Sequence, residues 1–72
     1  MSLTWTDTRA VAELLFEKYD TLDPRTIRLA DVRKWCPDLE DFTGRPEDAT
    51  DALLQAIQTD WYRQWQDEYG AG

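Results

Sequence analysis

A stripe of large apolar residues runs through the last third of the chain at helical spacing and fixes the longest element of the fold. It consists of Leu53, Leu54, Ile57, Trp61, Trp65 and Tyr69, which share one side of an α-helix. Pro46 suits the first turn, because proline has no amide proton to be left unpaired there. Glu47, Asp48 and Asp51 complement the positive end of the helix dipole, and Gly70 ends the helix. We therefore expect a helix of about twenty residues between Pro46 and Gly70.

A second periodic run predicts a helix near the N-terminus. Its apolar positions are Val11, Leu14, Leu15 and Tyr19. Thr6 or Asp7 is placed to cap the first amides of this helix, and Trp5 is placed to pack on its first turn as a hydrophobic staple. Glu13 and Glu17 lie off the apolar face, so we expect them to be solvated. The helix should end near Lys18–Asp20.

A third, shorter helix of about two turns is predicted before Pro37. Its apolar positions are Leu29, Val32, Trp35 and Cys36. Cys36 falls on or beside this face, and we interpret it as a small buried thiol. A reactive thiol is disfavoured, because Lys34 is the one nearby group that would lower its pKa.

The remaining segments are turns and, at most, very short strands. Asp23 precedes Pro24 and should be extended, and residues 26–29 alternate in a way that permits a short edge strand. A chain of 72 residues is one domain. We therefore expect a single mainly α domain over residues 1–72, with an ordered core over about 3–68 and three helices with at most one or two tiny strands.

Charge is distributed unevenly along the chain. Asp and Glu total 15 and Lys and Arg total 8, which gives a net charge of −7. Residues 1–37 hold six acids and six bases, whereas residues 38–72 hold nine acids and two bases, so the whole excess lies in the second half. Such a surface repels nucleic acid and anionic lipid and attracts cations or a basic protein patch. The alternative is that the acids only keep the protein soluble.

The chain lacks the residues that most catalytic mechanisms require. There is no histidine, one serine (Ser2) and one cysteine, so a nucleophile with a partnering base and a four-ligand zinc site are both missing. Glycine is too scarce for a phosphate-binding loop. We therefore expect a protein that is not an enzyme and has no tightly bound cofactor. The N-terminus lacks signal-peptide features and no apolar run is long enough to span a bilayer, so we expect a cytoplasmic location.

The stretch DLEDF (38–42) opens the acidic half of the chain. Asp38, Glu40 and Asp41 offer oxygen ligands to a hard divalent cation, in a weak and exposed site that selects poorly among Mg²⁺, Ca²⁺, Mn²⁺ and Fe²⁺. Leu39 and Phe42 are expected to tuck between the helices and turn the acids outward. A docking epitope is the alternative interpretation of the same acids.

Several motifs together resemble the IscX family, small acidic proteins of bacterial iron–sulfur cluster assembly. The chain opens with LTWTDTR (3–9) and continues with Tyr19, LDPRTIR (22–28), Asp31, Trp35, DLEDF (38–42), Pro46 and LLQAIQTDW (53–61). The resemblance spans residues 3 to about 65. It implies a modified winged-helix fold of three helices with rudimentary strands. The tail YRQWQDEYGAG (62–72) extends past the usual end of the family, and Trp65 and Tyr69 are expected only to lengthen the last helix.

The resemblance also implies a function. Family members bind a cysteine desulfurase, share its docking region with the bacterial frataxin homologue, modulate cluster formation and bind ferrous iron weakly. On this basis we expect an adaptor or regulator, acting as a monomer without nucleic-acid or membrane partners. Asp38, Glu40, Asp41 and Asp31 are the expected partner-binding residues, and Asp38, Glu40 and Asp41 the expected weak iron ligands. Within the same motifs, Asp7 and Asp23 have structural explanations, as a helix cap and a turn residue.

Two alternatives remain at this point. One is iron donation as the main role, with docking secondary. The other is DNA binding by a winged helix, for which Arg25, Arg28, Arg33 and Lys34 form a local basic cluster. DNA binding is disfavoured, because the helix that would enter the groove is acidic and would repel phosphates.

Overall fold

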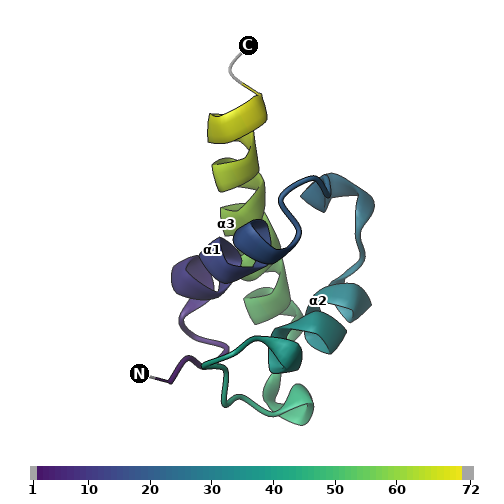
Figure 1. The fold of residues 1–72 in the computed structure, drawn as a ribbon. Helices are drawn as coiled ribbons and strands as arrows, with labels where there is room; N and C mark the ends of the chain where they lie inside the picture. The colour runs from purple at the N-terminus through teal and green to yellow at the C-terminus, as the bar shows by residue number, and fades with distance from the viewer. Residues whose placement is uncertain (1, 71–72) are drawn as a thin grey trace.

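Three α-helices form the framework of the computed structural model, which describes residues 2–70. In chain order the elements are α1 (Thr8–Lys18), the 3₁₀ turn η1 (Pro24–Thr26), α2 (Leu29–Trp35), the 3₁₀ turns η2 (Cys36–Asp38) and η3 (Pro46–Asp48), and α3 (Asp51–Tyr69). The long helix α3 packs against both α1 and α2 (Figure 1). The prediction of a mainly α, three-helix domain is confirmed. Among the helices of residues 2–70, none combines the length with the apolar composition that a bilayer-spanning segment requires.

The start of α3 differs from the prediction. Thr50 is the N-cap, and its Oγ1 accepts a hydrogen bond from the Leu53 amide at 3.2 Å. Pro46 lies in the separate turn η3, so the prediction that it opens the long helix is wrong. A threonine hydroxyl satisfies one of the unpaired amides of a first turn, which proline cannot do. The predicted end is confirmed, because the Gly70 amide donates to the Gln66 carbonyl at 2.7 Å as α3 stops.

The short edge strand that the pattern of residues 26–29 permits does not form. Thr26 ends η1 and Leu29 begins α2. Polar groups at the start of this segment form local hydrogen bonds instead. The Thr26 hydroxyl donates to the Asp23 carbonyl at 2.7 Å, and the Asp23 carboxylate accepts from the Arg25 amide at 2.9 Å. The β pairing within residues 2–70 is one isolated parallel bridge, between Leu3 and Phe42. These residues form no sheet, so the winged-helix topology stays a prediction.

The N-terminal end of α1 also departs from the expected cap. Asp7 occupies the N-cap position, but its side chain makes no bond to a helix amide. Its carboxylate accepts from the Thr4 amide at 3.0 Å instead, which closes the turn that precedes the helix. The bounds of α1, Thr8–Lys18, agree with the prediction.

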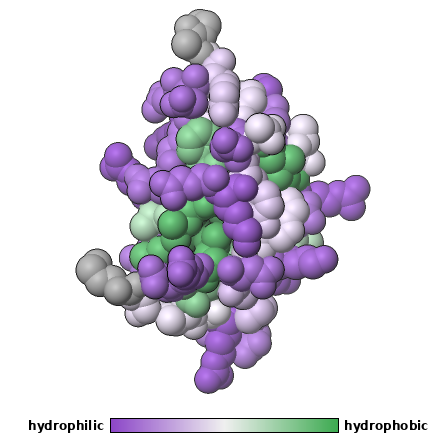
Figure 2. Space-filling view, in the orientation of Figure 1, coloured by the Kyte–Doolittle hydropathy of each residue, from purple (hydrophilic) through white to green (hydrophobic). Residues whose placement is uncertain are grey.

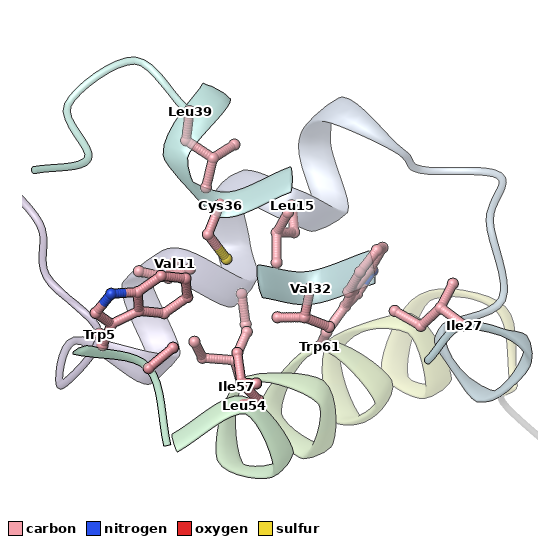
Figure 3. Packing of buried hydrophobic residues seen from close by; sticks show 12 residues of the cluster. Trp5, Val11, Leu15, Ile27, Val32, Cys36, Leu39, Leu54, Ile57 and Trp61 are labelled. Atoms are coloured by element: carbon pink, nitrogen blue, oxygen red, sulfur yellow. The ribbon is translucent and has the colours of Figure 1, made fainter. Parts of the chain in front are cut away.

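The core lies between α3 and the two shorter helices. Its fully buried side chains include Val11, Leu15, Val32, Cys36, Leu54, Ile57 and Trp61. The Cys36 sulfur points into this cluster (Figure 3), and burial raises the pKa of the thiol to about 12. The prediction of a buried Cys36 is confirmed. The apolar stripe of α3 extends beyond the core, and its last member, Tyr69, is 53% exposed.

Candidate functional site

The acidic loop, Asp38–Phe42, connects η2 to the irregular segment before η3. Leu39 is buried in the core, and Phe42 packs edge-on against the buried Trp5, with ring centroids 4.7 Å apart. Asp38, Glu40 and Asp41 are exposed. The predictions that Leu39 is buried and that the three acids face outward are therefore confirmed, whereas Phe42 is half-buried and packs on Trp5, which lies outside the helices.

The carboxylates of the acidic loop have no partners within residues 2–70. In this range the carboxylates that accept hydrogen bonds belong to Asp7, Asp23 and Asp31. The one ion pair in the described part of the chain joins Arg25 to Asp23 at 2.7 Å. As far as residues 2–70 are concerned, the loop carboxylates therefore have hydrogen-bonding capacity left for another group.

An open groove of about 370 Å³ separates the acidic loop from α1. Its lining consists of Leu14, Glu17, Lys18, Asp38, Leu39 and Glu40. The two leucines supply apolar surface, and the charged members are three carboxylates and one ammonium group. The groove thus combines an apolar surface with net negative charge. Across the face shown in Figure 2, hydrophilic side chains likewise cover most of the surface, with a smaller hydrophobic area between them.

Glu17 is the residue that sequence reasoning missed. From its position off the apolar face of α1 it was expected to be merely solvated, and it is indeed exposed. The fold nevertheless brings it to the same groove as Asp38 and Glu40. No local pattern signals this neighbourhood, because it arises from packing between segments distant in sequence.

The three loop carboxylates do not form a ready-made metal site. In the described range no three carboxylate or thiol side chains are gathered where they would hold one ion. Asp38, Glu40 and Asp41 would have to move together to share a cation. Oxygen ligands on flexible side chains bind hard cations without enforcing a geometry, so any binding here depends on that rearrangement.

Asp31 lies apart from the acidic loop. It sits in the first turn of α2, and the loop follows η2 beyond the other end of that helix. Its half-buried carboxylate accepts a hydrogen bond from the Arg28 amide at 3.0 Å, which satisfies an unpaired amide at the helix start. The residue thus has a structural role, and its predicted contact with a partner stays a prediction.

Two members of the basic cluster are already engaged within the chain. Arg25 pairs with Asp23, and its guanidinium stands over the rings of Tyr62 and Trp65, 5.4 Å from each centroid. The hydrogen bonds between Arg25 and Asp23 lower the pKa of the carboxyl and raise the pKa of the guanidinium. Arg33 donates to the Ala49 carbonyl at 3.3 Å. These contacts weigh against a free cationic surface for DNA phosphates.

Two comparisons with known proteins match nearly the whole chain. A family model described as iron–sulphur cluster assembly matches residues 3–66. The chain is also similar to an uncharacterized protein of Pseudomonas aeruginosa, with 38% identity over 61 residues, which covers 85% of this chain and 92% of that protein. The family match includes the acidic loop and ends before the last turn of α3.

Proposed function

The chain belongs to the iron–sulphur cluster assembly (IscX) family, and on this premise we propose that it is an acidic adaptor or regulator that docks on a cysteine desulfurase. In this proposal the chain performs no catalysis of its own. It competes with the bacterial frataxin homologue for a basic region of the desulfurase and thereby modulates cluster formation.

The free carboxylates of the acidic loop carry this proposal. Asp38, Glu40 and Asp41 are exposed and have no partners within residues 2–70, so no ion pair in that range has to break before docking. Buried Leu39 and the packing of Phe42 hold the loop backbone. A pre-ordered segment loses less conformational entropy on binding, and unpaired charges of one sign steer a basic partner toward it.

The groove beside the loop is suited to a long basic side chain. An arginine or lysine of the partner would lay its aliphatic stem on Leu14 and Leu39, as such stems do on apolar surface. Its charged head would meet Glu17, Asp38 or Glu40 in charge-assisted hydrogen bonds. Glu17 thereby joins the residues that we assign to docking.

Weak ferrous iron binding is the second part of the proposal. Asp38, Glu40 and Asp41 would be the ligands, with iron as cargo rather than as a resident cofactor. Iron donation as the main role depends on the same carboxylates. Docking is favoured over it, because within the described part of the chain the acids are exposed and unpaired but not gathered around a common point.

Binding to a purified cysteine desulfurase at two salt concentrations tests the docking proposal. Isothermal titration should give measurable affinity at low ionic strength and a marked loss at high ionic strength, because salt screens exposed charges. Absence of binding at low salt would contradict desulfurase docking. Affinity that does not depend on salt would contradict the acidic loop as the docking surface.

A further inference from the structure

The segment that follows Leu39 is held to the rest of the molecule by the start of the chain. We call residues 3–5 the N-terminal strap. The Leu3 amide donates to the Asp41 carbonyl at 2.7 Å, and the Thr43 amide donates back to the Leu3 carbonyl at 2.8 Å. The Trp5 Nε1–H donates to the Arg45 carbonyl at 2.6 Å. Figure 1 shows the strap meeting this later segment beside the N-terminus.

The strap supplies all the long-range hydrogen bonds of residues 40–48 within the described range. The remaining bonds of this segment are local turns, in which the amides of Phe42, Asp48 and Ala49 donate to the carbonyls of Leu39, Arg45 and Pro46. Side-chain packing adds to the hold: a Cβ at Gly44 would lie 2.8 Å from the indole of Trp5 and 2.9 Å from the ring of Phe42. The backbone of Gly44 thus lies directly against both aromatic rings.

We propose that the N-terminal strap positions the acidic loop for its partner. Leu3 fixes the backbone at Asp41 and Trp5 fixes it at Arg45, so that the loop carboxylates are presented in one geometry. Trp5 is only 3% exposed, so it acts through the loop rather than by touching a partner. The identity of that partner rests on the proposed function, whereas the hold of the strap on the loop does not.

Substituting a positioning residue and substituting a charged contact residue should change the salt dependence of the binding affinity differently. Removing a loop carboxylate should change both the affinity and its slope against salt, because a charge has been lost. Loosening the strap should weaken binding by a similar factor at every salt concentration. The charges are then unchanged, but the loop must be ordered at the moment of binding.

The test compares Trp5→Phe with the matched control Trp65→Phe, which removes an indole from α3 away from the strap. Trp5→Phe keeps an aromatic ring but removes the donor to Arg45. Leu3→Pro, a second variant, removes the amide that bonds to Asp41. Amide hydrogen exchange of Thr43 reports loop order, and exchange of the core amide of Ile57 checks that each variant is folded.

We expect Trp5→Phe and Leu3→Pro to speed Thr43 exchange by about tenfold and to weaken desulfurase binding by about fivefold, with an unchanged salt slope. Trp65→Phe should do neither. Unchanged Thr43 exchange in both strap variants would overturn the positioning role. Faster exchange with unaltered affinity would overturn its link to docking. If the unaltered protein fails to bind the desulfurase, the proposed function falls, while the exchange data still decide whether the strap orders the loop.

Discussion

The indole of Trp5 meets the ring of Phe42 edge-on, with centroids 4.7 Å apart and ring planes at 77°. Edge-on aromatic pairs of this kind contribute about 0.5–1.5 kcal/mol beyond the area they bury. The contact joins the N-terminal strap to the acidic loop, two segments at opposite ends of the first 42 residues. It explains the apolar residue at the end of DLEDF, which fastens a loop whose acids stay in water.

Replacing Gly44 with alanine should destabilise the fold. The added Cβ would lie 2.8 Å from the Trp5 indole, closer than carbon atoms pack. Trp5 is buried and hydrogen-bonded to Arg45, so it cannot move aside freely. We expect Gly44→Ala to lower the free energy of unfolding by about 1–3 kcal/mol, measured by urea denaturation. Stability equal to or above that of the unaltered protein would show that the packing at Gly44 is looser than described.

Thr50→Ala should destabilise α3 by removing its cap. The Thr50 hydroxyl accepts from the Leu53 amide, and loss of such a cap costs about 1 kcal/mol. Thr59→Ala is the matched control, because Thr59 is exposed in the middle of the same helix and alanine has the higher helix propensity. Thermal unfolding should separate the two variants. Equal stabilities would contradict Thr50 as the start of the helix.

Local sequence signals recover the helices but not all of their ends. The spacing of Leu54, Ile57 and Trp61 identifies α3, and Gly70 marks its end, because both signals act within a few residues. The beginning was misplaced because Pro46 and Thr50 both favour helix starts. Only the hydrogen bond to Leu53 decides between them.

Contacts between segments that are distant in the sequence cannot be predicted from local sequence signals. The outward acids of DLEDF follow from the alternation with Leu39 and Phe42. The bridge from Leu3 to Phe42 does not, since neither residue stands in a recognisable strand pattern. Glu17 reaches the groove only because α1 packs beside the acidic loop. Patterns within one element predict its buried face, whereas the neighbours of its exposed face depend on the assembled fold.

The buried thiol of Cys36 should make stability fall at alkaline pH. Burial raises its pKa from 9.0 to about 12, so above pH 9 the unfolded chain releases a proton that the folded chain keeps. The stability contributed by the neutral thiol is therefore complete below pH 9 and is lost as pH rises toward 12, by at most about 1.4 kcal/mol per pH unit.

Urea unfolding of the unaltered protein and of Cys36→Ala, at several values between pH 8 and pH 10.5, measures this effect. The variant lacks the thiol, so the stability difference between the two proteins should change with pH. A constant difference would mean that the thiol titrates alike in both states. Iodoacetamide should likewise leave the folded protein unmodified at pH 8, because only the thiolate reacts.

Ferrous iron should perturb the acidic loop selectively. In anaerobic NMR titrations we expect paramagnetic broadening at Asp38, Glu40 and Asp41, extending to Glu17 across the groove. The binding should be weak, because the carboxylates are not pre-assembled. A variant with Asp38→Asn, Glu40→Gln and Asp41→Asn should lose the effect. Broadening that spares residues 38–42 would show that iron binds elsewhere.

Charge reversal in the acidic loop tests the docking proposal most directly. Glu40→Lys with Asp41→Lys changes the net charge from −7 to −3. The exposed pair Asp67→Lys with Glu68→Lys makes the same change in the last turn of α3. Both variants should keep the circular dichroism spectrum of the unaltered protein. We expect the loop variant to lose at least about tenfold in affinity for the cysteine desulfurase, and the control to stay within about threefold. A folded loop variant that binds as tightly as the control would contradict the acidic loop as the docking surface.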